Sequence, residues 1–165
     1  MQLLNRYFFP YAAFLILTAI YCVEPDRRTT ALSVGVLLLS AAVNHWFVRY
    51  SYRIVRWTRF LRAAQVWLNY VWSVPLVYLL GGWWAPMWLL LAMAPATAAM
   101  FQSRRQTLLT AVVSALTLLA LYWYRGVEGP VAWGQALVHA SFIIVFSMLI
   151  HSLNQLALRL RDSRI

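Results

Sequence analysis

The chain alternates between long apolar stretches and short polar connections. Six apolar stretches lie at 7–23, 30–48, 61–80, 84–101, 107–124 and 131–158. Most are close to the roughly 20 residues that cross a bilayer as a helix. The connections carry Gly or Pro, which end helices, or charged residues, which are unfavourable in lipid. This pattern predicts an all-α fold: a polytopic six-helix transmembrane bundle in residues 1–158, with antiparallel neighbours and a tail at 159–165.

Composition supports a lipid environment. The 165 residues are 63% hydrophobic and 11% charged, whereas a soluble domain is nearer half apolar and a quarter charged. The net charge of +10 comes from 14 basic residues, all of them arginine. Such an excess can indicate nucleic acid binding, but these arginines lie at the ends of apolar stretches. They therefore predict anionic lipids, and not nucleic acid, as partners.

The distribution of arginine predicts the orientation. If the N-terminus is cytoplasmic, the outer side holds Arg27, Arg28 and Arg125, and the other arginines all fall on the inner side. Positively charged residues are enriched in cytoplasmic connections. Both termini are therefore expected in the cytoplasm, and the protein is expected to be a multi-pass membrane protein.

The sequence RIVRWTRFLR between the second and third stretches has two interpretations. Arginine at every third position is typical of a voltage-sensor helix, which also needs acidic partners on neighbouring spans. No predicted span contains Asp or Glu, so a membrane-surface helix whose arginines contact lipid phosphates is favoured. A protein partner with an acidic surface is the other use considered. The residues concerned are Arg49, Arg53, Arg56, Arg59 and Arg62.

Polar residues inside the predicted spans are candidate ligand-binding residues. They fall on the second, third and sixth stretches and comprise Asn44, His45, Gln65, Asn69, Ser73, His139, Ser147, His151 and Asn154. One interpretation is that they hydrogen-bond to one another and hold the bundle together. The other is a pocket lined by these three helices. Pro75 and Pro95 are hinge candidates within the third and fourth stretches.

The three histidines limit the cofactors that such a pocket would take. Two b-type haems need four axial histidines and the chain has three, so haem is disfavoured. Zinc is disfavoured because the histidines lack ligand spacing. A quinone, or another flat lipophile, needs only one or two donors and fits best. The chain also lacks a catalytic triad, an HExxH motif and paired carboxylates within spans, so we expect no enzyme activity, no resident metal and no required cofactor.

One short motif resembles a known family. Gly81, Gly82, Ala85 and Pro86 form a GGxxxP connection between the third and fourth stretches, and Arg104 and Arg105 form a basic turn before the fifth. These features resemble the six-helix membrane sensor domains of bacterial sensor histidine kinases, in the redox-responsive, quinone-linked subgroup. Leu80 stands where that family usually has threonine. The resemblance implies a location in the bacterial inner membrane and a final helix that leaves the membrane as a signalling stalk.

Three functions are consistent with these observations. The first is an integral membrane sensor or regulatory module that couples a lipophilic ligand or the state of the membrane to a cytoplasmic signalling partner. The second is a small accessory or structural subunit of a larger membrane complex. The third is a substrate-capture component of a transporter. No kinase part occurs within these residues, so a sensor of this kind needs a separate output partner.

Overall fold

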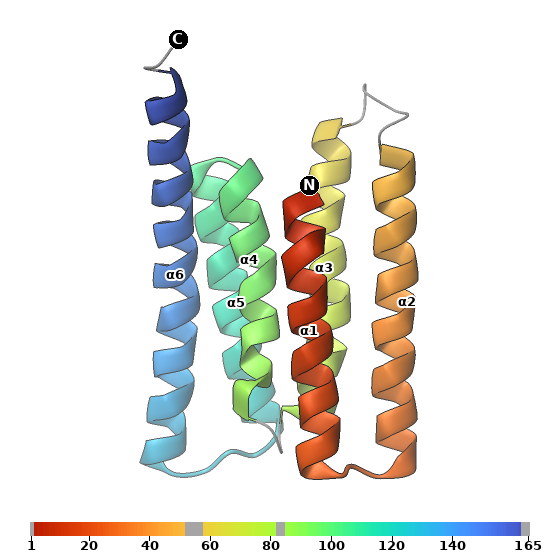
Figure 1. Cartoon of the computed structure of the whole chain (residues 1–165). Coiled ribbons are helices and arrows are strands. Elements are labelled where there is room, and N and C mark those ends of the chain that lie inside the picture. The colour runs from red at the N-terminus through yellow and green to blue at the C-terminus, as the bar shows by residue number, and fades with distance from the viewer. Residues whose placement is uncertain (1, 52–57, 82–84, 163–165) are drawn as a thin grey trace. The chain divides into compact units, whose positions relative to one another are not determined.

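The computed structural model describes residues 2–51, 58–81 and 85–162, and these residues form six α-helices and one 3-10 helix (Figure 1). The prediction of an all-α, six-helix chain is therefore confirmed. The elements are α1 (Gln2–Val23), α2 (Arg27–Ser51), α3 (Thr58–Leu80), η2 (Ala85–Trp88), α4 (Leu89–Phe101), α5 (Arg104–Tyr124) and α6 (Pro130–Asp162).

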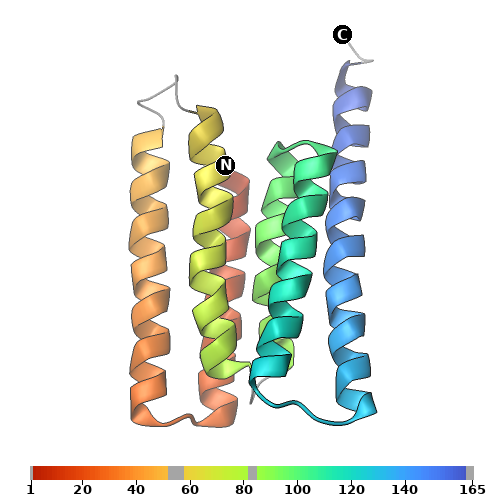
Figure 2. The same cartoon turned by 180° about the vertical axis from the view of Figure 1, so that it is seen from behind.

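The helices belong to two compact units, Met1–Leu90 and Leu91–Ile165. The first unit contains α1, α2, α3 and η2, and the second contains nearly all of α4 together with α5 and α6. Within each unit, short connections join helices that run in opposite directions (Figures 1 and 2). The antiparallel arrangement expected from short connections is thus observed inside the units.

Three helices are long and apolar enough to cross a membrane. Within the described residues these segments are Arg27–Trp46, Arg104–Tyr124 and Pro130–Arg161, while Pro10–Val23, Val66–Leu80 and Pro86–Phe101 are shorter apolar helices. Because a span needs about 20 apolar residues, the first three indicate a multi-pass protein in a lipid bilayer. Six complete crossings and cytoplasmic termini remain predictions.

Local sequence explains where α2 and α5 begin. The carboxylate Oδ2 of Asp26 accepts a hydrogen bond of 3.3 Å from the backbone N–H of Thr29, which satisfies one of the unpaired donors at the start of α2. At α5, the N–H of Gln106 donates to Oγ of Ser103 at 3.5 Å, and the N–H of Ser103 donates to Oε1 of Gln106 at 3.3 Å. This reciprocal pair is a capping box, encoded by the sequence SRRQ.

Gly126 ends α5. Its φ is +66°, a left-handed conformation that costs glycine little. The N–H of Gly126 donates to the Trp123 carbonyl at 2.9 Å, and the N–H of Val127 donates to the Tyr122 carbonyl at 3.2 Å. These two bonds form a Schellman motif, which turns the chain sharply toward α6 and lets α5 and α6 pack as an antiparallel pair.

Candidate functional site

The end of α4 is a point where the backbone needs external hydrogen-bond donors. The last four carbonyls of any α-helix have no partner within that helix. In α4, which ends at Phe101, the Ala98 carbonyl accepts from the N–H of Gln102 at 2.8 Å. Only Gln102 and Ser103 separate α4 from α5, so the connection offers few backbone donors to the Ala99 and Met100 carbonyls.

Two side chains of α6 supply donors to this helix end. Nδ1 of His151 lies 3.1 Å from the carbonyl oxygen of Ala99, and Nδ2 of Asn154 donates to the Met100 carbonyl at 3.0 Å. Because a carbonyl oxygen only accepts, Nδ1 of His151 carries the proton. The two residues are three positions apart, so they share one face of α6. His151 is only 7% exposed, and it is therefore held inside the second unit by a specific contact.

Pro95 lies one turn before Ala99 in α4 and is fully buried. Proline has no backbone N–H, so it removes one hydrogen bond from the interior of α4 and weakens the helix at that point. The hydroxyl of Thr97 donates to the Met93 carbonyl at 2.8 Å beside it. The contact of α6 with α4 therefore lies just beyond the position where α4 is least tightly hydrogen-bonded.

His139 contacts a different helix, nearer the start of α6. Its Nδ1 lies 3.5 Å from the hydroxyl oxygen of Tyr122 on α5. Between the two histidine contacts, Ser147 is fully buried and donates to the Ile143 carbonyl of its own helix at 2.6 Å. Three of the four candidate residues on α6 thus bond to another helix of the same unit, and the fourth bonds within α6.

Two candidate residues of the first unit, Ser73 and Asn44, show no hydrogen bond to another helix among the described residues. Ser73 is buried and its hydroxyl donates to the Asn69 carbonyl at 2.8 Å, with the Tyr70 carbonyl at 3.3 Å. A serine that bonds back to its own helix in this way needs no ligand. Oδ1 of Asn44 is buried and has no hydrogen-bond partner in the part of the chain that the structure describes. A buried acceptor left unpaired costs roughly 1–3 kcal/mol, so Asn44 is the candidate whose surroundings call for a donor.

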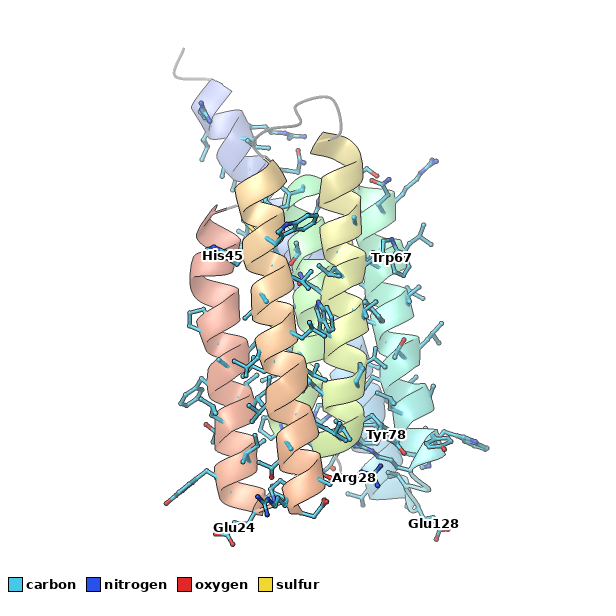
Figure 3. The ribbon with its side chains drawn as sticks, turned by 90° about the vertical axis from the view of Figure 1, so that its right-hand side faces the viewer. Glu24, Arg28, His45, Trp67, Tyr78 and Glu128 are labelled. Carbon is cyan, nitrogen blue, oxygen red and sulfur yellow. The ribbon has the colours of Figure 1, made fainter. Side chains whose placement is uncertain are left out.

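His45, next to Asn44 on α2, is exposed. Figure 3 shows it in the half of the first unit that also contains Trp67 of α3, far from Glu24 and Arg28 at the other end of the unit. Trp67 is 55% exposed. An exposed tryptophan is typical of a helix bundle that meets lipid.

The remaining predictions fall partly outside the described residues. Arg53 and Arg56 lie there entirely, and the side chains of Arg49, Arg59, Arg62 and Gln65 lie there although their backbones belong to α2 and α3. Contact of the arginines with lipid or with a protein partner stays a prediction. The pocket predicted between the second, third and sixth helices also stays a prediction, since α2 and α3 belong to one unit and α6 to the other.

Metal binding finds no group of ligands among the described residues, because no three His, Cys, Asp or Glu side chains come together there. The partners that sequence reasoning missed are Tyr122 and the carbonyls at the end of α4. Tyrosine near the end of a span is typical of the membrane interface, so its role as a histidine partner was hidden. The SRRQ capping box was a usable signal, since it places the start of α5 and hence the end of α4.

No protein-family model, curated protein or solved structure matches this chain. The resemblance to sensor domains, which depends on a short motif, therefore stays a prediction. Evidence about function comes from the geometry of the helices themselves.

Proposed function

We propose that the chain is an integral membrane sensor or regulatory module without enzymatic activity. It couples a lipophilic ligand, or the state of the membrane, to a cytoplasmic signalling partner. In this proposal α4 responds to the membrane interior and α6 carries the response to the partner. Both termini lie in the cytoplasm, the membrane is the bacterial inner membrane, and the arginines of the inner connections contact anionic lipids.

The observation that carries the proposal is the pair of hydrogen bonds from His151 and Asn154 to the end of α4. They join α6 to the segment just beyond Pro95. Beyond Asn154, α6 continues to Asp162 and projects past the connection between α4 and α5 (Figures 1 and 2). Its 33 residues amount to about 50 Å of helix, against about 30 Å of hydrocarbon in a bilayer. A displacement of α4 at Pro95 would thus be passed to an exposed helix end.

The proposal requires two arrangements of the helices in equilibrium. A ligand shifts that equilibrium only if it binds the two arrangements with different affinity. Asn44 offers a buried acceptor, Oδ1, that has no partner among the described residues. The hydroxyl of a quinol is a donor of the required kind, in agreement with the quinone-linked group that the GGxxxP motif resembles. Lipid extracted from purified protein and examined by mass spectrometry tests this choice, with Asn44→Leu as the variant expected to lose the bound quinol.

The proposed coupling to a cytoplasmic signalling partner is tested by purification of the tagged chain from native membranes. We expect the wild-type chain to bring down a kinase or a response regulator. The double variant His151→Ala, Asn154→Ala should recover several-fold less of that partner at an equal level of the chain itself. Ser152→Ala is the matched control, because Ser152 lies on the same turns, is exposed and donates its hydroxyl to the Met148 carbonyl of its own helix.

Two results would contradict the proposal. Recovery of several subunits of one membrane complex, unchanged in the double variant, would identify an accessory subunit. Recovery of a pair of ATPases would identify the substrate-capture component of a transporter.

The orientation has its own test. Cys22, near the outer end of α1, is exposed, so a membrane-impermeant maleimide added to intact spheroplasts should label it. A single cysteine introduced as Ala157→Cys in a Cys22→Ser background should react only after the membrane is permeabilised. Labelling of position 157 in intact spheroplasts would reverse the proposed topology.

A further inference from the structure

Ser114 lies in the middle of α5, and its hydroxyl is fully buried without a hydrogen-bond partner in the described part of the chain. The hydroxyls of Thr117, Ser147 and Ser152 in the same unit each donate to a carbonyl of their own helix. Such a bond is the usual alternative for a serine within a helix. Because an unpaired buried hydroxyl is unfavourable, we expect the surroundings of Ser114 to supply a partner.

The contact between α5 and α6 shows which residue of α6 lies level with Ser114. The hydroxyl oxygen of Tyr122 is 3.5 Å from Nδ1 of His139, and the two helices run in opposite directions (Figure 2). Ser114 comes eight residues before Tyr122, and Ser147 comes eight residues after His139. Because α-helices rise by the same amount per residue, the two fully buried serines lie at one level of the antiparallel pair.

Pro95 of α4 lies at that level too. Nδ1 of His151 is bonded to the Ala99 carbonyl, and α4 and α6 run in the same direction (Figure 1). Four residues back along each helix are Pro95 and Ser147. Since Pro95 has no N–H, the carbonyl of Leu91 one turn earlier lacks its usual donor within α4. Leu91 and Pro95 are both fully buried and four residues apart, so they share one buried face of α4.

These three groups have complementary hydrogen-bonding needs. The Ser114 hydroxyl has a proton to donate. The Ser147 hydroxyl gives its proton to the Ile143 carbonyl at 2.6 Å, so it offers only lone pairs, and the Leu91 carbonyl also only accepts. One donor and two acceptors match a molecule that accepts one hydrogen bond and donates two, as water does. Buried waters typically make about three such bonds, and an ordered water is one of the means by which proline is tolerated in a membrane helix.

We infer that Ser114, Ser147 and the Leu91 carbonyl form a binding site for one buried water molecule, which joins α4, α5 and α6 at the level of Pro95. The water accepts a hydrogen bond from the Ser114 hydroxyl and donates to the Ser147 hydroxyl oxygen and to the Leu91 carbonyl. It thereby replaces the hydrogen bond that Pro95 removes from α4. The site lies one turn deeper in the helices than the contact of His151, and it does not require the proposed sensing role.

A double-mutant cycle tests the link between Ser114 and Pro95. Pro95→Ala restores an N–H to α4, so the Leu91 carbonyl then has its donor without the water. SDS titration of the whole chain in mixed micelles gives the unfolding equilibrium constant. Ser114→Ala should raise this constant about three-fold, the size usual for a hydrogen bond between membrane helices, and should leave it nearly unchanged in the Pro95→Ala background. Thr117→Val is the matched control; its effect should be the same in both backgrounds, because the Thr117 hydroxyl bonds within α5.

The water itself is detected by NMR of the chain in lipid nanodiscs. We expect magnetisation transfer from water to the amides of residues 114 and 147, and this transfer should fall several-fold in Ser114→Ala and stay unchanged in Thr117→Val. The inference is overturned if the wild type shows no transfer at these two residues. It is also overturned if Ser114→Ala is at least as stable as the wild type, or if its effect is the same with and without Pro95.

Discussion

The two units of the chain bury different kinds of side chain. In the first unit the buried positions of α1 and α3 are mostly large, among them Leu15, Ile16 and Tyr70. In the second unit the buried faces of α5 and α6 are mostly small, among them Ala115 and Ala140. Small residues let two helix backbones approach closely, so α5 and α6 are held by close backbone packing and α1 to α3 by interdigitated side chains.

The two units also differ in whether their polar side chains bond within one helix or between helices. Ser40 and Ser73 in the first unit donate to carbonyls of their own helices. In the second unit His151 and Asn154 bond across to α4. A hydrogen bond between two helices fixes the position of one helix relative to the other. A serine bonded to its own helix does not, so that position then depends on side-chain packing. The second unit is therefore the better suited to hold one defined helix arrangement.

The largest effect is expected when volume is added between the closely packed helices α5 and α6. Ala115 is 4% exposed, and Ala115→Leu should lower the free energy of unfolding by about 1–3 kcal/mol through overpacking. Titration with SDS in mixed micelles measures this change. The same substitution at the exposed Ala120 of α5 is the control. Equal effects at both positions would mean that α5 has no closely packed face.

Removal of volume should affect the first unit next most strongly. Leu15 is 6% exposed and Leu17 is 57% exposed on the same helix. Leu15→Ala should cost roughly 1–2 kcal/mol, less than in a soluble core, because a lipid-exposed reference state leaves mainly the cavity term. Leu17→Ala should change the free energy of unfolding by much less. A larger loss at Leu17 would reverse the assignment of the buried face of α1.

Loss of a polar contact between helices should have a smaller effect. Asn154→Ala removes the donor to the Met100 carbonyl and should cost about 0.6 kcal/mol, and not more than about 1.7 kcal/mol, as is usual for such bonds in membranes. The same SDS titration measures it, with the exposed Gln155→Ala as the control. A variant as stable as wild type would show that water or lipid replaces Asn154 at no cost.

The smallest effect is expected at the helix caps, where a charged side chain, Asp26, caps α2 and neutral side chains cap α5. Hydrogen bonds from Thr29 lower the pKa of Asp26 below its ordinary value of 3.8, so its contribution is present above that pH and is lost as the pH falls through the lower, folded value. The melting temperature of Asp26→Ala should be slightly below that of wild type at neutral pH, and the gap should close in acid. Asp26→Asn keeps the cap and should remove that pH dependence. A gap that widens in acid would contradict this.

Sequence patterning anticipated the helices better than their ends. Apolar stretches predicted all six helices, because lipid tolerates backbone polar groups only where a helix pairs them. Hydropathy does not show where a helix continues into water, so the prediction ended the last helix at 158 while α6 extends to Asp162. The start of the fourth was placed at 84, where Pro86 instead belongs to the 3-10 turn η2.

The polar residues of the site were easier to identify than their partners. His151 and Asn154 stood out because polar groups are rare in apolar helices. Every residue carries a carbonyl, however, so the ones they would bond depended on where α4 ends and on which helix α6 packs against. In the sequence, Asn44 and Ser73 had the same interpretation as polar residues within spans. The structure distinguishes them, because the Ser73 hydroxyl is paired within its helix and Oδ1 of Asn44 has no partner in the described part of the chain.

The contacts that close the end of α4 also order the events of biosynthesis. Ala99 and His151 are 52 positions apart, so the ribosome delivers α4 well before the residue that completes it. Until α6 has been translated and inserted, the Ala99 and Met100 carbonyls lack the donors that His151 and Asn154 supply. The second unit is therefore expected to mature only after α6 has been inserted beside α4.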